Sequence, residues 1–263
     1  MAQDIVSPTD DRPEIRNRPS ALPTPGAGWA LFLDVDGTLV ELAAEPDSVR
    51  VDARLIALLD ALRAKLGGAV ALVSGRTIGT LDRLFAPLAL PAAGNHGLER
   101  RDCDGRIRRS GAAPAMAEIG AAMRRFAGDH PGVIVEDKML SVALHYRNRP
   151  QAAKPAAELA QRLVTRHDGD LIVQNGKMMV EVRPGCADKG TAIADFLDET
   201  PFAGRVPVFV GDDVTDETGF ALVNARGGYA IRVGDEPQTV ARYRVPDVVG
   251  VIDWLEGVVA ASD

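Results

Sequence analysis

Two carboxylates, Asp34 and Asp36, directly follow the short apolar run WALFL at residues 29–33. An apolar run of this length is typical of a buried strand in a parallel sheet, and open α/β sheets bind ligands beyond the carboxyl ends of their strands. Two acids this close repel each other unless a cation lies between them. Gly37 then allows a backbone turn. The pattern indicates a site for a hard cation and a phosphate, and the alternative is an acidic surface turn.

Three further polar clusters follow apolar runs, namely Ser74–Arg76, Asn95–His96 and Asp212–Asp213. Each alone could be a solvated loop, but the carboxyl ends of parallel strands meet at one edge of a sheet. Asp34, Asp36 and Asp212 would together supply oxygen ligands for an octahedral cation. Mg²⁺ fits such a set, because it binds few carboxylates, retained waters and a substrate phosphate.

Lys189 lies in the first turn of a predicted helix, where the helix dipole disfavours a cation. The N–H groups of a helix start, together with an ammonium, suit an anion, to which the Ser74 hydroxyl could also donate. The alternative is a surface lysine that tolerates a small cost. Thr215 has the residue type of an N-cap, and Asp216 after it is either a partner of the helix dipole or an outer partner of the metal site.

These residues lie at the ends of predicted strands and helices. Strands and helices alternate along two stretches of the chain, one before and one after a central insert. This alternation predicts a parallel sheet with right-handed crossovers. Apolar periodicity predicts helices at 52–66, 77–85, 188–197, 215–223 and 252–259, and strands at 29–33, 69–73, 88–93, 206–210, 229–233 and 246–249.

Between the two parts, the order helix–strand–strand occurs twice, which predicts an α+β insert. Alternation places Ser141, His145 and Arg147 on one side of one strand, and Lys177, Glu181 and Arg183 on one side of another. This polar face would meet water or cover a ligand, and the direction of Lys138 stays open. The expected helices lie at 114–127 and 155–166, and the expected strands at 132–136, 140–146, 171–173 and 178–183.

Composition argues against a nucleic-acid-binding, a disulfide-rich or a membrane-spanning protein. The 263 residues are 46% hydrophobic and 25% charged, with a net charge of -7 and no basic stripe, so a nucleic-acid partner is not expected. Cys103 and Cys186 make no disulfide framework and fit a reducing cytoplasm. No segment has the apolar length of a membrane span or the pattern of a secretory signal. Residues 1–28, rich in proline, are expected to be a disordered leader. The protein is expected to be a monomer.

Four stretches resemble the motifs of the haloacid dehalogenase superfamily of phosphotransferases: DVDGTL from Asp34, SGR from Ser74, Lys189, and GDDVTDE from Gly211. The resemblance implies an α/β fold with a Rossmann-like parallel-sheet core (29–108 and 185–263) and an inserted α+β cap (109–184). It implies that Asp34 attacks phosphorus, that Asp36 is the acid and base, and that Lys189 assists. The implied sites are phosphate at Asp34, Ser74, Gly75 and Lys189, Mg²⁺ at Asp34, Asp36 and Asp212, and outer partners at Thr38, Asp213 and Asp216.

A narrower set of stretches resembles the trehalose-6-phosphate phosphatase family: GNHGLE at 94–99, Lys138 with HYR at 145–147, GK at 176–177 and EVRP at 181–184. This implies Mg²⁺-dependent hydrolysis of a small sugar phosphate, trehalose 6-phosphate, through an aspartyl-phosphate. His96 is expected to be a hydrogen-bond donor rather than a metal ligand, because no second histidine lies at ligand spacing. The expected sugar contacts are Arg76, Asn95, His96, Glu99, Lys138, His145, Arg147, Lys177, Glu181 and Arg183.

Three alternatives stay open beside this hypothesis. A phosphosugar mutase such as phosphomannomutase also begins with a DVDGT run, but the Asn95–His96 pair and the run at 212–217 argue against it. Another sugar-phosphate phosphatase of the same superfamily would share the catalytic residues. A non-catalytic regulatory module is disfavoured by the intact Asp34, Asp36, Lys189 and Asp212.

Overall fold

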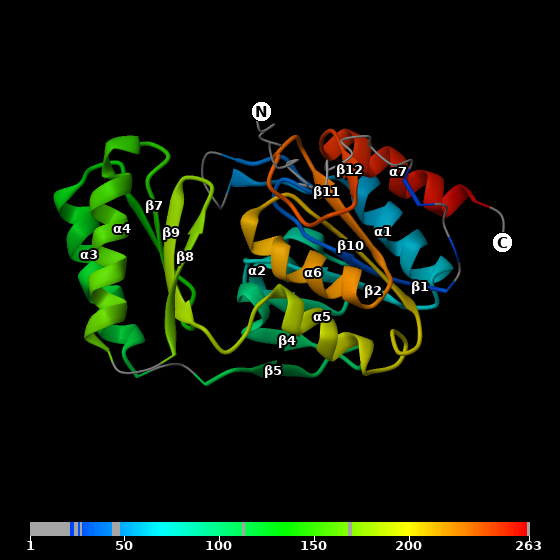
Figure 1. Ribbon diagram of the computed structural model, residues 1–263, viewed down its shortest axis with the longest axis horizontal. Coiled ribbons are helices and arrows are strands. Elements are labelled where there is room, and N and C mark those ends of the chain that lie inside the picture. Colours follow the sequence, from blue (N-terminus) through cyan, green and yellow to red (C-terminus); the bar gives the residue numbers. More distant parts are fainter. Residues whose placement is uncertain are drawn as a thin grey trace, which may run out of the picture.

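A computed structural model describes residues 22–23, 26, 28–43, 48–111, 114–167 and 170–261 of the chain. Most of the expected leader, residues 1–28, lies outside these ranges, although Leu22 packs against the core. The described chain forms an eight-stranded sheet and a separate four-stranded sheet, which lie side by side (Figure 1). None of its helices combines the length and apolarity that crossing a bilayer requires.

The large sheet has the strand order β12-β11-β10-β1-β2-β3-β4-β5. Strand β1 is central and buried along its whole length, and its neighbours β10 and β2 both run parallel to it. The chain moves to opposite sides of β1 to reach these neighbours, and such a reversal of strand order is where open α/β sheets bind ligands. The parallel strands are β1 (Trp29–Leu33), β2 (Val70–Val73), β3 (Ala92–Gly94), β10 (Val206–Gly211), β11 (Tyr229–Val233) and β12 (Tyr243–Val245), and β4 (Glu99–Arg101) and β5 (Ile107–Arg109) are antiparallel.

Helices cover both faces of this sheet, because successive side chains of a strand point to opposite faces. Leu31 and Leu33 of β1 pack in one apolar cluster, whereas Phe32 packs in the other. The first cluster lies under α1 (Ala53–Lys65), α2 (Ile78–Phe85) and α7 (Val248–Ala260), and the second under α5 (Lys189–Leu197) and α6 (Glu217–Ala225). Burial of each large apolar side chain contributes about 1.5–3 kcal/mol.

The small sheet is antiparallel, with the order β6-β7-β9-β8. Helices α3 (Met116–Asp129) and α4 (Ala153–Arg166) cover one of its faces, and the other face is turned toward the large sheet (Figure 1). Its strands are β6 (Ile134–Asp137), β7 (Val142–His145), β8 (Leu171–Gly176) and β9 (Met179–Pro184). The predicted α+β insert in an α/β chain is confirmed.

Several predicted elements differ from the structure. The expected strand at 246–249 is wrong, because the Asp247 side chain accepts a hydrogen bond from the Gly250 amide (2.8 Å) and starts α7. Thr215 is not an N-cap, since Asp213 caps the 3₁₀ turn Val214–Asp216 that precedes α6. The hairpin of β4 and β5 was not predicted, because its strands consist mainly of charged residues. Strand β5 also reaches residue 109, the expected start of the cap.

Candidate active site

Three carboxylates gather at the carboxyl edge of the large sheet. Asp34 follows β1, Asp212 follows β10, and Asp216 lies just before α6; all three are buried, and one oxygen of each lies within 4.8 Å of the others. The parallel register Leu33↔Val210 brings the ends of β1 and β10 to the same level. Gly37 has a φ of 80°, and a Cβ there would lie 2.2 Å from Oδ2 of Asp212. A glycine is therefore needed both for the turn and for the space that Asp212 occupies.

Lys189 is not a surface lysine but a buried cation at the start of α5. Its Nζ lies 2.8 Å from Oδ1 of Asp34 and 2.6 Å from Oδ1 of Asp216. Burial alone would lower the pKa of Lys189, but Asp216 and Asp34 outweigh it and raise that pKa. Burial raises the pKa of Asp34 well above its usual value, and Lys189 opposes this shift only in part. An additional cation would favour the ionised carboxylate that a nucleophile requires.

The carboxylate of Asp212 has an oxygen that could bind a divalent cation. Oδ1 of Asp212 is buried and has no hydrogen-bond partner among the described residues, while Oδ2 accepts from Nζ of Lys177 (2.5 Å). A buried oxygen without a partner is costly, and a hard cation would satisfy it. Asp216 already uses both oxygens, since Oδ2 accepts from the amides of Asp212 (2.9 Å) and Asp213 (2.8 Å). Asp216 therefore orients the loop and Lys189.

Asp36 does not join these acids. Its carboxylate accepts two hydrogen bonds from Arg76, from Nε to Oδ2 (2.6 Å) and from Nη2 to Oδ1 (2.7 Å). Among the described residues, the carboxylates that lie together are those of Asp34, Asp212 and Asp216. The expected Mg²⁺ set of Asp34, Asp36 and Asp212 stays a prediction. Sequence offers one signal for Asp216, its position four residues after Asp212 at a helix start.

The loop after β2 lies beside the acid cluster. Ser74 is buried, and its Oγ accepts a hydrogen bond from the amide of Arg76 (3.2 Å). A Cβ on Gly75 would lie 2.7 Å from the His96 ring, so this residue must be small. The Thr38 hydroxyl is buried without a hydrogen-bond partner in the described structure. Hydroxyl and backbone groups at this edge are suited to holding phosphate oxygens.

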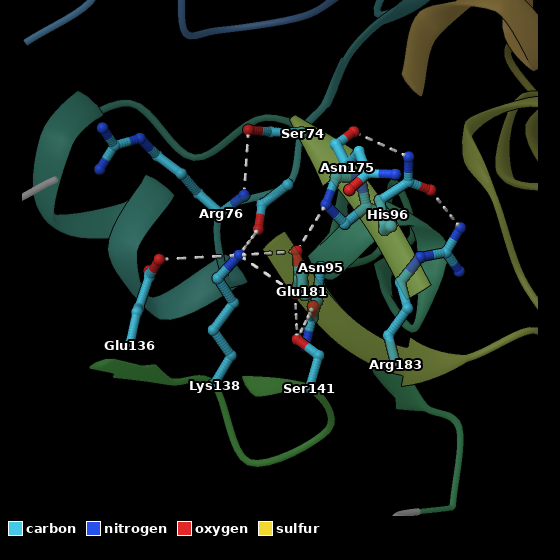
Figure 2. A network of polar contacts seen from close by, with 12 residues as sticks. Ser74, Arg76, Asn95, His96, Glu136, Lys138, Ser141, Asn175, Glu181 and Arg183 are labelled. Atoms are coloured by element: carbon cyan, nitrogen blue, oxygen red, sulfur yellow. Dashed lines mark hydrogen bonds and ion pairs between the residues drawn. The ribbon is translucent and has the colours of Figure 1, made fainter. Parts of the chain in front are cut away.

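Polar contacts join the small sheet to the large one around Glu181, which is fully buried (Figure 2). Oε2 of Glu181 lies 3.2 Å from Nε2 of His96, and Nζ of Lys138 lies 3.3 Å from Oε1. Lys138 also donates to the carbonyl of Gly75 (2.9 Å). Burial alone would raise the pKa of Glu181, but Lys138, His96 and Ser141 outweigh it and hold that pKa far below its usual value. The small sheet thus lies closed against the large one.

The amide orientation of Asn95 follows from the same network. Oγ of Ser141 lies 2.7 Å from Oδ1 of Asn95 and also contacts Oε1 of Glu181. A hydroxyl has one proton, and the carboxylate is the stronger acceptor, so the Asn95 amide must present its NH₂ group to Ser141. This orientation also gives a partner to Nδ2, which otherwise has none within the described ranges. Asn95 and His96 both have positive φ (49° and 56°), a strained conformation that tends to occur at functional sites.

Comparison with known proteins assigns the chain to a family. The family described as trehalose-phosphatase matches residues 32–248, which include the small sheet, most of the large sheet and the acid cluster. The chain belongs to the trehalose-phosphatase family. It is 44% identical to the probable trehalose-phosphate phosphatase of Sinorhizobium fredii, over 92% of this chain and 90% of that protein. It is 41% identical to the trehalose-6-phosphate phosphatase of Escherichia coli, over 91% and 90% of the two chains.

Solved structures support the fold of this trehalose-phosphatase family member. The C-terminal domain of the C. albicans trehalose-6-phosphate phosphatase matches 90% of this chain and 93% of its own length, with a TM-score of 0.80 at 20% identity. A trehalose-6-phosphate phosphatase related protein matches 87% of this chain and 96% of its own, with a TM-score of 0.69 at 26% identity. The Rossmann-like core with a cap of the haloacid dehalogenase type is thereby confirmed.

A cavity between the two sheets is lined by most of the predicted site residues. Its floor carries Asp34 and Asp212 of the acid cluster, and its roof carries residues of the small sheet and its loops. The predicted residues that line it are Asp34, Asp36, Gly75, Arg76, His96, Lys138, His145, Arg147, Lys177, Lys189, Asp212 and Asp213.

Four expected sugar contacts do not line this cavity, namely Asn95, Glu99, Glu181 and Arg183. Glu99 accepts from the amide of Ile78 (3.3 Å), and Arg183 donates to the carbonyls of Pro184 (3.0 Å) and Ala187 (2.5 Å). Neither lines the cavity, because β4 and the end of β9 turn these side chains toward backbone groups. Asn95 and Glu181 are fully buried, where Glu181 contacts His96 and Asn95 contacts Ser141.

Glu136 is a charged residue at the cavity that was not predicted from the sequence. Glu136 lines it, accepts from Nε2 of His145 (2.8 Å) and lies 3.8 Å from Nζ of Lys138. Burial alone would raise the pKa of Glu136, but His145 and Lys138 outweigh it and lower that pKa. Glu136 ends a predicted strand and lies two residues before Lys138 in the sequence. This position could have indicated a role at the site.

Proposed function

We propose that this chain hydrolyses trehalose 6-phosphate to trehalose and phosphate, with Mg²⁺ as the cofactor. One observation carries the chemistry: Asp34, Lys189 and Asp212 converge on one edge of the sheet, beneath a cavity with a polar roof. The substrate follows from the relatives, which are named for trehalose phosphate and align over nine tenths of the chain. A buried acid cluster of this kind is costly, and its retention favours an enzyme over a binding module.

In the first step, Asp34 attacks phosphorus and forms an aspartyl-phosphate while the sugar oxygen leaves. Lys189 keeps the Asp34 carboxylate in place and offsets its charge, and Asp216 keeps Lys189 in place. When bound at Asp34 and Asp212, the divalent cation would supply further charge neutralisation. Since phosphate monoesters hydrolyse extremely slowly in water, positioning and electrostatic stabilisation must provide most of the acceleration.

Asp36 serves as the general acid and then as the general base. It protonates the leaving sugar oxygen and later removes a proton from the water that hydrolyses the aspartyl-phosphate. Its carboxylate lines the same cavity as Asp34 but has a different cation beside it, Arg76 in place of Lys189. Different surroundings are what allow two nearby acids to take separate roles. Ser74 and Gly75 would hold the phosphoryl oxygens.

The segment 109–184 is proposed to be a cap over a catalytic core formed by 29–108 and 185–263. The cap closes the cavity and excludes water from the phosphoryl centre, which strengthens each electrostatic interaction there. Cap contacts with core groups, such as Lys138 with Gly75 and Lys177 with Asp212, support a closed arrangement. The sugar would contact the polar residues of this cavity, namely Arg147, His145, Glu136, Lys138, Lys177 and His96.

A substrate panel tests the proposal. Phosphate release is measured with Mg²⁺ present for trehalose 6-phosphate and for mannose, sucrose and glucose phosphates, with Asp34→Asn as the blank for contaminating phosphatases. We expect trehalose 6-phosphate to have the highest kcat/KM. Faster turnover of another sugar phosphate would overturn the substrate assignment, and conversion of one sugar phosphate to another without release would indicate a mutase.

A further inference from the structure

Arg76 and Asp36 form a two-pronged ion pair inside the cavity. Nε and Nη2 of Arg76 each donate to a different oxygen of Asp36, at 2.6 and 2.7 Å. The Arg76 side chain is 10% exposed, whereas that of Asp36 is 30% exposed, so the carboxylate faces the open part of the cavity. A paired contact of this geometry fixes the plane of the carboxylate as well as its position.

The backbone of Arg76, from which the guanidinium extends, is fixed by hydrogen bonds. The amide of Arg76 donates to Oγ of Ser74 (3.2 Å), and its carbonyl accepts from the amide of Asn95 (2.7 Å). A Cβ on Gly94 would lie 2.9 Å from that carbonyl, so the strand end packs directly against it. On the other side, the bridge Asp36↔Val40 fixes the turn after β1. Arg76 and Asp36 therefore meet from two fixed strand ends.

This geometry differs from that of a sugar-contacting arginine. The two Arg76 nitrogens that point into the pair are occupied by Asp36, and most of the side chain is covered. Asp34, two residues before Asp36, has an ammonium partner instead. Each of the two acids thus has its own cation, and the planar cation faces the acid whose orientation matters for proton transfer.

We propose that Arg76 is a positioning residue that orients the carboxyl group of Asp36 for proton transfer to the leaving oxygen. This inference rests on the proposed function. In the step concerned, an Asp34 oxygen forms a bond to phosphorus and the bond from phosphorus to the sugar oxygen breaks. The electron pair goes to the sugar oxygen, which takes the proton that Asp36 must carry at the start of this step and leaves as an alcohol, so that Asp36 becomes a carboxylate. Arg76 stabilises the carboxylate that remains.

The test compares two substrates whose leaving groups differ in how strongly they depend on protonation by a general acid. Phenyl phosphate and p-nitrophenyl phosphate have similar size, but phenolate is the poorer leaving group and depends more on a general acid. For Arg76→Gln we expect kcat/KM to fall about 10²-fold with phenyl phosphate, within the range of general acid catalysis, and less than about fivefold with p-nitrophenyl phosphate. Arg76→Lys should restore part of the loss. Arg83→Gln is the matched control, because Arg83 lies exposed on α2 and contacts Thr80.

A double-mutant cycle separates action through Asp36 from a general structural role. Asp36→Asn alone should show the same dependence on the leaving group, and adding Arg76→Gln to it should change kcat/KM less than about threefold. Equal losses with both aryl phosphates, or additive losses in the cycle, would overturn the role of Arg76 while leaving the phosphatase assignment intact. A wild-type protein that releases no phosphate from trehalose 6-phosphate or from either aryl phosphate would instead overturn the proposed function. Circular dichroism of each variant checks folding.

Discussion

Nε2 of His96 lies 3.2 Å from Oε2 of Glu181, although 85 residues separate the two in the chain. Both side chains are buried, one on the large sheet's loop and one on the small sheet. Burial lowers the pKa of His96, and Glu181 opposes that shift only in part. His96 is therefore neutral near pH 7 and donates its Nε2 proton to Glu181, which leaves Nδ1 as an acceptor without a partner in the described structure.

Stability should depend on pH through His96. Because the folded pKa of His96 lies below the unfolded value of about 6.5, the unfolded state binds the proton more readily, so this contribution to stability is present above about pH 6.5 and is lost as pH falls below it. His96→Gln should therefore flatten the decrease in unfolding free energy between about pH 7.5 and 5.5. Urea unfolding at several pH values measures this, with His130→Gln as control, since His130 contacts a carbonyl of its own helix. Identical slopes for wild type and His96→Gln would contradict the assignment.

Lys189→Met should destabilise the fold by about 3–5 kcal/mol and abolish turnover. The substitution leaves Asp34 and Asp216 buried without their shared cation. Urea unfolding gives the free energy of unfolding, and Lys154→Met, an exposed position on α4, should stay within about 0.5 kcal/mol of wild type. Equal effects of the two substitutions would show that Lys189 does not stabilise the acid cluster.

Gly37→Ala should reduce kcat/KM by about 10²-fold, because the new Cβ would meet the Asp212 carboxylate at 2.2 Å and displace it. Gly204→Ala is the matched control: Gly204 has a similar φ of 75° but no neighbouring atom within 4 Å of the new Cβ. In both variants an alanine must adopt a positive φ, which costs a similar free energy. The two variants therefore differ only in the steric clash of the new Cβ with Asp212. Comparable activity of both variants would mean that Asp212 tolerates displacement.

Asp34→Asn should retain binding of trehalose 6-phosphate while kcat falls by more than about 10³-fold, since an amide cannot serve as the nucleophile. Isothermal calorimetry measures binding, and a phosphate-release assay measures turnover. Asp60→Asn, an exposed position paired with Arg63, should behave as wild type. Substantial turnover by Asp34→Asn would reject Asp34 as the attacking group.

Removal of divalent cations with a chelator should abolish phosphate release, and Mg²⁺ should restore it. Asp212→Asn should raise the Mg²⁺ concentration needed for half-maximal activity at least about tenfold. The substitution removes the charge of a buried carboxylate whose Oδ1 has no hydrogen-bond partner in the part of the chain that the structure describes. Full activity in the chelated protein would exclude a metal at this cluster.

Residue types and their order were enough to predict the α/β core with its insert, the position of Asp34 and Asp212 at strand ends, and the cation at a helix start. The physical reason is local: apolar runs form buried strands, and parallel strands bring their carboxyl ends to one edge whatever the loops do. The family resemblance used these same residues, and the matching family covers them.

Only tertiary structure decided which groups meet. Asp216 rather than Asp36 completes the acid cluster, Arg76 pairs with Asp36, and Arg183 turns to the backbone. Alternation along a strand gives the side of a residue but not its partner. Lys189 reaches Asp34 across 155 residues of chain, and such a contact depends on how two separate elements pack, which no local pattern encodes.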